Sequence, residues 1–194
     1  MMDAISRLFN SPVIRKVLIR LRLLLGLAAV VGVALLIRRA PREWFWPGLA
    51  ISALGAALQW WCFACIMTSK ELAANGPYAY VRNPMYLSRF LLVIGLFVMT
   101  GKVWLVAVAA VLYYLYMANR VGREEPKLAA IFGEPYAEYC RAVPRFVPSF
   151  RRFPPGRPLF WSWECFRRNH GLTNMIAVLA AYAALWWFVY AYQA

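Results

Sequence analysis

Residues 44–68 read WFWPGLAISALGAALQWWCFACIMT, an almost unbroken apolar run. A membrane-spanning helix needs about 20 consecutive, mostly apolar residues, and this run exceeds that length. Trp44 and Trp46 open it, and tryptophan is enriched where a helix leaves the bilayer. The whole chain is 63% hydrophobic, against about 45–50% apolar residues in soluble domains. The run therefore predicts a transmembrane helix in a membrane protein.

Four other runs have a similar character: residues 17–37, 84–100, 103–119 and 172–193. The run from residue 103 is expected to continue as a helix to about Ile131, because Gly133 is a typical residue for ending a helix. Together the five runs predict an all-α integral membrane protein with about five transmembrane helices. The 194 residues suffice for a single membrane domain.

The charge distribution indicates how the helices are oriented. With five spans and a cytoplasmic N-terminus, 18 of the 22 Lys and Arg residues lie on the cytoplasmic side, as the positive-inside rule requires. Residues 120–171 are then cytoplasmic, and their many prolines predict short helices and turns, including a helix at 134–141. No cleavable signal peptide is evident, which fits a bacterial inner membrane or, in a eukaryote, the endoplasmic reticulum.

Composition argues against several other functions. The basic residues lie between apolar runs rather than along an aromatic-rich stripe, so we expect no nucleic-acid partner. Cys62 and Cys65 lie inside an apolar run and are expected to pack there, and His170 is the only histidine. A Ser-His-Asp triad is therefore not expected, and neither is a metal site, which would need more soft ligands.

Two clusters could support chemistry on the cytoplasmic side. Glu124 and Glu125 end the fourth span, and carboxylates near a bilayer are candidates for function; alternatively, they simply pair with neighbouring bases such as Arg120. The second cluster is the loop at residues 75–86, where Asn83 precedes Pro84 at the start of a helix. Alternatively, this loop is an interfacial aromatic belt with an arginine anchor.

The two clusters together offer suitable groups for a ligand of mixed charge. An aromatic face attracts a sulfonium, Arg82 and a helix N-terminus hold a carboxylate, and a glutamate accepts hydrogen bonds from a ribose or an ammonium. These are the polar groups of S-adenosylmethionine, although other ligands of mixed charge would also fit.

The order of motifs adds a family resemblance. Residues 76–86, GPYAYVRNPMY, resemble the G-x-Y-x-x-x-R-H-P-x-Y motif of the isoprenylcysteine carboxyl methyltransferase and phospholipid methyltransferase superfamily. Residues 123–128 (REEPKL), 132–139 (FGEPYAEY) and 143–148 (VPRFVP) resemble its E-E-x-x-L, F-G-x-x-Y-x-x-Y and P-R-F-x-P motifs.

This resemblance implies a small helical enzyme that binds S-adenosylmethionine on its cytoplasmic side and takes a lipophilic acceptor from the bilayer. The cofactor-binding residues would be Tyr78, Arg82, Asn83, Pro84, Tyr86, Glu124 and Glu125. Glu124, Glu125 and Arg145 would serve the reaction, and Tyr136, Tyr139 and Arg89 would face the acceptor. Segments outside the motifs would set the acceptor and could also form a homodimer surface.

The chain departs from the motif at Asn83, where the family has histidine. Asparagine keeps a hydrogen-bonding side chain but cannot serve as a base near neutral pH. An acceptor that is already a carboxylate needs no base, whereas an amine must lose a proton, which Glu124 or Glu125 could accept.

Two rival functions fit parts of the sequence. NADPH-dependent membrane reductases of the steroid 5α-reductase type have a similar R-x-P-x-Y stretch, and the C-terminal region offers arginines for a 2′-phosphate. A non-catalytic lipid-binding membrane protein would use its basic segment on anionic headgroups. The acceptor stays open among phospholipid amine, prenylated carboxylate, small thiol and isoprenoid.

Overall fold

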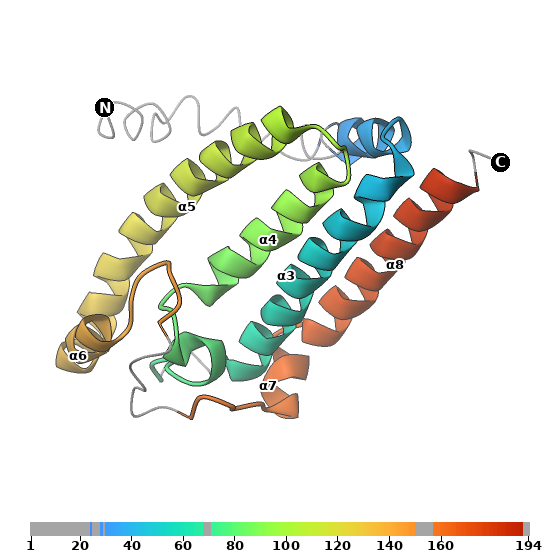
Figure 1. Cartoon of the computed structure of the whole chain (residues 1–194). Coiled ribbons are helices and arrows are strands. Elements are labelled where there is room, and N and C mark those ends of the chain that lie inside the picture. The colour runs from blue at the N-terminus through green and yellow to red at the C-terminus, as the bar shows by residue number, and fades with distance from the viewer. Residues whose placement is uncertain (1–23, 25–27, 29, 68–70, 150–156, 192–194) are drawn as a thin grey trace.

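The computed structural model describes residues 24, 28, 30–67, 71–149 and 157–191, and these residues contain helices and no strands (Figure 1). This confirms the predicted all-α class. The long helices are α3 (Phe45–Cys65), α4 (Pro84–Val98), α5 (Val103–Phe132) and α8 (Gly171–Tyr190). The short ones are η1 (Arg42–Trp44), η2 (Gly76–Ala79), α6 (Glu134–Ala142) and α7 (Trp163–Arg168).

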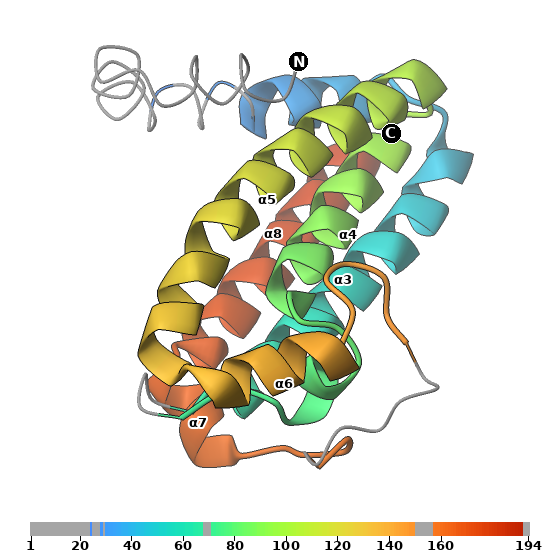
Figure 2. The same cartoon turned by 90° about the vertical axis from the view of Figure 1, so that its left-hand side faces the viewer.

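Three of the described helices are long and apolar enough to cross a membrane: α3 together with η1, α5, and α8. Helix α4 is apolar but has only 15 residues. Most of the span expected at 17–37 lies outside the described residues. Residues 30–38 are helical, and they lie across the end of the bundle where α3 begins, rather than along it (Figures 1 and 2).

Small residues bring α3 and α4 into close contact. Gly48, Ser52 and Gly55 line the α4-facing side of α3, and a Cβ atom at Gly55 would lie 2.6 Å from the backbone nitrogen of Leu92. A Cβ atom at Gly95 would collide with the backbone and side chain of Ser52. Small residues at regular spacing allow helix backbones to approach in membranes. This contact places the start of α4 beside the end of α3.

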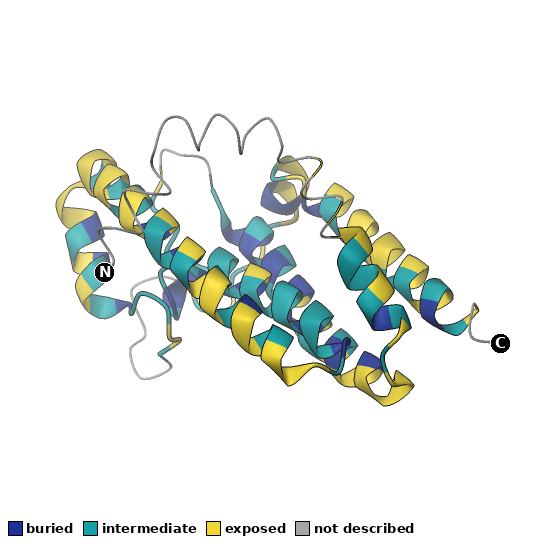
Figure 3. Ribbon diagram, turned by 90° about the horizontal axis from the view of Figure 1, so that it is seen from above, coloured by how far each residue is buried: buried dark blue, intermediate teal, exposed yellow. Residues whose placement is uncertain are grey.

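The outer faces of the bundle are apolar and exposed. Helix α5 exposes Val103, Trp104 and Leu112, and α8 exposes Ile176 and Trp187. Figure 3 shows these exposed faces on the outer helices. Apolar side chains on this scale would be unfavourable in water, so we conclude that these faces contact the hydrocarbon of a bilayer.

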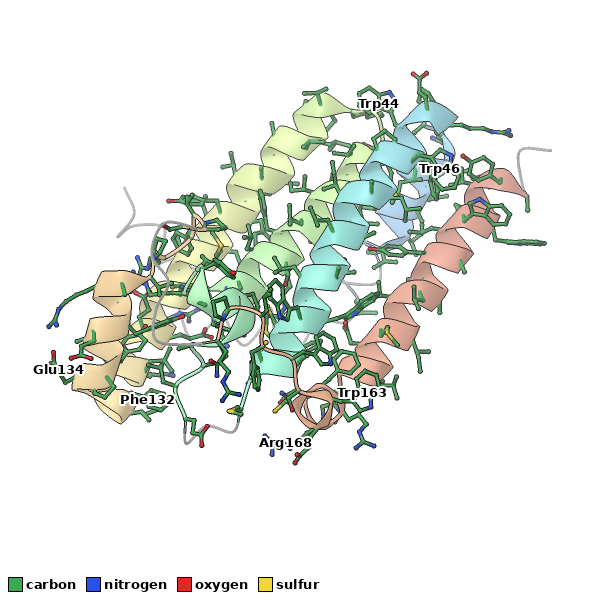
Figure 4. All side chains as sticks on the ribbon, turned by 60° about the horizontal axis from the view of Figure 1, so that its bottom comes forward. Trp44, Trp46, Phe132, Glu134, Trp163 and Arg168 are labelled. Atoms are coloured by element: carbon green, nitrogen blue, oxygen red, sulfur yellow. The ribbon has the colours of Figure 1, made fainter. Side chains whose placement is uncertain are left out.

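The connecting segments gather at one end of the bundle, which we call the loop end. It contains η2, α6, α7 and residues 143–149 (Figures 1 and 2). In Figure 4, Phe132, Glu134, Trp163 and Arg168 mark this end, whereas Trp44 and Trp46 mark the other. Helix α5 ends at Phe132 and is capped by Gly133, whose φ of 58° suits glycine. The short helix α6 follows directly, as the sequence predicts.

Candidate functional site

The loop before α4 has the geometry that its glycine and prolines favour. Gly76 has a positive φ of 59°, which glycine adopts without a steric cost. Pro77 lies in the short helix η2, and Pro84 is the first residue of α4. Asn83 has φ −123° and ψ 54°, outside the α region that a following proline disfavours. This turn places Arg82 and Asn83 at the loop end of the bundle.

Glu125 is the centre of an ion-pair network. The Nε atom of Arg145 donates to its Oε1 atom at 3.1 Å, and the Nη2 atom of Arg145 contacts Oε2. The Nη1 atom of Arg82 lies 3.4 Å from Oε1, and the side chains of Arg82 and Glu125 are only 17% and 16% exposed. One carboxylate therefore joins α5, the loop before α4 and the segment after α6.

Glu124 has a different environment, because successive residues of a helix point about 100° apart. Its Oε2 atom accepts a 2.8 Å hydrogen bond from the Tyr86 hydroxyl. Its Oε1 atom lies 2.8 Å from the Nε atom of Arg120, one turn earlier on α5. The side chain is 38% exposed. The predicted pairing with a neighbouring base is confirmed for Glu124, which also stays accessible.

Backbone hydrogen bonds connect the loop before α4 to the segment after α6. The Arg82 backbone N–H donates to the Pro144 carbonyl at 2.9 Å. The Asn83 side-chain amide donates to the Arg145 carbonyl at 3.2 Å. These bonds fix the backbone of Arg145 where its guanidinium reaches Glu125. Position 83 therefore acts here through a hydrogen bond, the kind of contact that asparagine can still make.

Two residues that contact this site, Cys140 and Tyr113, have no role in the sequence motifs. The Nη1 atom of Arg82 donates to the Cys140 sulfur at 2.8 Å. The Tyr113 hydroxyl donates to the Tyr86 carbonyl at 3.0 Å. Neither residue type nor spacing singles them out in the sequence.

The Nε atom of Arg82 is buried without a hydrogen-bond partner, so it is a donor available to a bound anion.

Three tyrosines of the loop end have buried phenols. Burial raises the pKa of Tyr136 and Tyr139, and it raises the pKa of Tyr78 well above its usual value. The Tyr139 hydroxyl donates to the Tyr78 carbonyl at 2.7 Å. The Tyr78 ring packs against Cys62 and Cys65. These phenols stay neutral at physiological pH and therefore do not serve as phenolate bases.

The structure brings most of the predicted site residues together, but not all. Direct contacts connect four of them: Arg82, Asn83, Glu125 and Arg145. Tyr86 contacts Glu124, the residue next to Glu125 on α5. Pro84 is buried at the start of α4. Arg89 is exposed on α4, where its Nη2 atom lies 3.4 Å from the Met85 sulfur. No group of three or more His, Cys, Asp or Glu residues within the described ranges is placed to hold a metal ion.

Comparisons with known proteins agree with these motifs. The family model described as phospholipid methyltransferase matches residues 48–135. The protein-S-isoprenylcysteine O-methyltransferase of Schizosaccharomyces pombe is 30% identical over 91 residues, which are 44% of this chain and 39% of that protein. Both matches confirm the resemblance to the isoprenylcysteine carboxyl methyltransferase and phospholipid methyltransferase superfamily.

Two bacterial proteins are also similar. The cobalt-zinc-cadmium resistance protein CzcN of Cupriavidus metallidurans is 34% identical over 106 residues, 52% of this chain and 49% of that protein. The nickel-cobalt-cadmium resistance protein NccN of Alcaligenes xylosoxydans is 29% identical over 127 residues, 62% of this chain and 59% of that protein. The alignments thus span between two fifths and three fifths of the relatives' lengths. No solved structure matches the chain significantly.

Proposed function

We propose that this protein transfers a methyl group from S-adenosylmethionine to a lipophilic acceptor at the cytoplasmic face of a membrane. One observation supports this proposal most directly: Glu125 pairs with Arg82 and Arg145, so that three separate sequence motifs meet in one half-buried network. Charge pairing within one helix would join only residues about four positions apart, whereas this network joins three distant segments of the chain. The methyltransferase name of one relative and the matching family model support the same reaction class.

The residues present fit the proposed cofactor. The partnerless Nε atom of Arg82 is a donor for a carboxylate, and an arginine fork suits that group. Glu124 remains accessible and can accept hydrogen bonds from a ribose or an ammonium. When bound, the cofactor supplies an electrophilic methyl group on a sulfonium. The chain's own groups would align the reactants and exclude water.

Proton transfer depends on the acceptor. A carboxylate acceptor needs no base, whereas an amine acceptor must lose a proton. Glu124 is the accessible carboxylate of the site and would take that proton. The single histidine, His170, lies at the start of α8 and outside this network. The chemistry therefore rests on alignment, with Glu124 as the base where one is needed.

Charge supports a cytoplasmic loop end. The opposite end includes four described basic residues, Arg38, Arg39, Arg42 and Lys102. The described part of the loop end includes nine: Arg82, Arg120, Arg123, Lys127, Arg141, Arg145, Arg157, Arg167 and Arg168. An excess of positive charge marks the cytoplasmic side of membrane proteins. The bacterial sources of two relatives agree with an inner-membrane location. The names of those two relatives refer to metal resistance and define no reaction.

Calorimetric titration of the detergent-purified protein with S-adenosylmethionine tests the proposal. We expect saturable binding that Glu125→Ala and Glu125→Gln both abolish, while Glu138→Ala, at an exposed glutamate of α6, leaves it unchanged. Thermal unfolding shows whether each variant is folded. Absence of binding to the folded wild type would refute the proposal. Binding of NADPH instead would favour the reductase, and binding of neither ligand would favour a non-catalytic lipid-binding protein.

A further inference from the structure

Residues 157–168 form a strap at the loop end that takes no part in the proposed site. The strap reads RPLFWSWECFRR and ends in α7, shortly before the apolar helix α8. The Gly76 N–H donates to the Arg157 carbonyl at 2.9 Å. The Arg157 backbone N–H in turn donates to the Asn75 side-chain oxygen at 2.8 Å. The strap is therefore bonded to the beginning of the loop before α4.

The first half of the strap alternates between inward and outward side chains, as an extended segment does. Phe160 packs against the buried cluster that includes Tyr78, and its carbonyl accepts from the Trp61 indole at 2.9 Å. The Ser162 N–H donates to the Ala64 carbonyl at 3.1 Å, at the end of α3. The outward side chains are apolar and exposed: Leu159 (87%), Trp161 (48%) and Trp163 (52%).

Stacking holds the two outward tryptophan rings in place. Trp163 stacks on Phe166 with ring centroids 5.2 Å apart, and Trp161 lies 5.4 Å from the same ring. Phe166 is itself buried. Because the rings are already ordered, a partner that binds them loses little affinity to side-chain ordering. Tryptophan combines an apolar ring with a polar N–H, and it is enriched where a membrane meets water.

Arginines flank these apolar side chains. Arg157 precedes them, Arg167 and Arg168 follow on α7, and all three are exposed. Figure 4 shows Trp163 and Arg168 on the same short helix at the loop end. Among the described residues, no carboxylate forms an ion pair with any of the three arginines. With Glu164 as its single acidic residue, the strap has three positive charges and one negative charge. Its surface therefore suits an anionic partner.

The place of the strap in the fold indicates which anionic partner it meets. Helix α7 lies at the end of α8 (Figures 1 and 4), and α8 exposes the apolar side chains of Leu172 and Ile176. The strap therefore borders a surface that contacts hydrocarbon, at the level where α8 leaves the bilayer. The headgroup layer lies at this level, and on the cytoplasmic side of membranes it contains anionic phospholipids.

We propose that the strap is a docking surface for the anionic phospholipid headgroups of the cytoplasmic leaflet. The arginines bind lipid phosphates through charged hydrogen bonds, and the two tryptophans lie at the boundary between headgroups and acyl chains. Since the strap is bonded to Asn75 and Gly76, this docking also fixes the loop before α4 at the membrane surface. The surface acts in this way whether or not the protein transfers a methyl group.

The first test compares two phospholipids that differ in headgroup charge. Dioleoyl phosphatidylglycerol or dioleoyl phosphatidylcholine is added to the full-length protein in dodecyl maltoside, and the thermal unfolding midpoint is recorded. Phosphatidylglycerol should raise the midpoint more, and high salt should reduce the difference by screening. Replacing all three arginines of the strap by glutamine should require at least about tenfold more phosphatidylglycerol for the same rise, since each contributes roughly fivefold near an anionic surface.

A matched control removes the same charge elsewhere. The triple variant Lys102→Gln, Lys127→Gln, Arg141→Gln changes three exposed basic residues outside the strap. It should need no more than about threefold more phosphatidylglycerol than the wild type, a factor that corresponds to little binding energy. Equal effects of the two lipids on the wild type would overturn the proposal. Equal losses in the strap variant and the control variant would also overturn it.

The second test locates the bound lipid by fluorescence. Phosphatidylglycerol with brominated acyl chains should quench tryptophan emission more than brominated phosphatidylcholine does. The double variant Trp161→Phe, Trp163→Phe keeps an aromatic ring at both positions and should lose this difference. Trp44→Phe, Trp46→Phe, at the opposite end of the bundle, should keep it. A difference that survives in the strap variant would place the lipid elsewhere and refute the docking surface. A dimer in detergent that the arginine variant dissociates, without any phosphatidylglycerol effect, would refute it in favour of a second copy.

Discussion

Replacing Asn83 by aspartate tests how position 83 acts. The two side chains have the same shape, but aspartate has an oxygen where Asn83 donates to the Arg145 carbonyl at 3.2 Å. The change removes one hydrogen bond, which contributes about 0.5–1.5 kcal/mol of stability. It also leaves a carbonyl oxygen facing a carboxylate oxygen, which costs about 1–3 kcal/mol more. The new carboxylate also attracts the Arg145 guanidinium away from Glu125. Both effects disturb the pairing of Arg145 with Glu125, a residue that we propose for cofactor binding.

We expect Asn83→Asp to weaken S-adenosylmethionine binding by at least about tenfold, since 1.4 kcal/mol corresponds to that factor. Asn83→His restores the residue of the family motif, and a ring N–H can donate to the same carbonyl. This variant should bind the cofactor within about threefold of wild type, on the order of 0.7 kcal/mol. Calorimetry gives both affinities, and tritiated methyl transfer into lipid extract gives the rates between pH 6 and 8.

Two results would refute this reasoning. Wild-type affinity in Asn83→Asp would show that the hydrogen bond to Arg145 does not position the site. A tenfold faster Asn83→His variant, with a new rate dependence near the usual histidine pKa of about 6.5, would show that position 83 serves as a base. We expect instead that the pH profiles of Asn83→His and wild type coincide.

Two further substitutions test the packing that supports the site, with thermal unfolding in detergent as the measurement. Tyr139→Phe should lower the unfolding free energy by about 1–3 kcal/mol, because the buried carbonyl of Tyr78 loses its donor; an unchanged midpoint would contradict the assigned bond. Gly95→Ala should destabilise the protein by driving a Cβ atom into Ser52, typically about 1–3 kcal/mol for overpacking. Gly122→Ala, whose Cβ meets nothing within 4 Å, is its control and should not destabilise; equal losses in both would argue against close α3–α4 packing.

The sequence predicts the helices better than their arrangement. Run length and turn residues indicate where α5 and α8 lie, because a bilayer imposes a minimum span on apolar segments. The sequence does not reveal that residues 30–38 lie across the end of the bundle, since apolarity specifies a length but no direction. Nor does it show that Gly48 and Gly95 meet, because pairing between helices depends on shapes that only the folded chain brings together.

The site shows the same division between local and distant contacts. The pairing of Glu124 with Arg120 follows from their spacing of four residues on one helix. The pairing of Glu125 with Arg145 and Arg82 requires the chain to turn at Gly133 and to dock residues 144–145 on the loop before α4. The predicted topology put Glu125 and Arg82 on the same side of the membrane, whereas only the family resemblance added Arg145 to that site. Cys140 gave no signal, because its contact with Arg82 depends entirely on the fold.

The adjacent glutamates Glu124 and Glu125 have different environments, and each environment suits a different role in the proposed site. Glu125 is half-buried and bound by two guanidinium groups. Loss of either partner would leave a partly buried charge uncompensated, so this carboxylate is poorly suited to leave them for a reactant. Glu124 is more accessible and is held by one phenol and one exposed arginine, so a ligand can exchange with either partner at modest cost. The 100° between successive helical residues is enough to separate these environments. We therefore propose that Glu125 assembles the site and that Glu124 responds to what binds there.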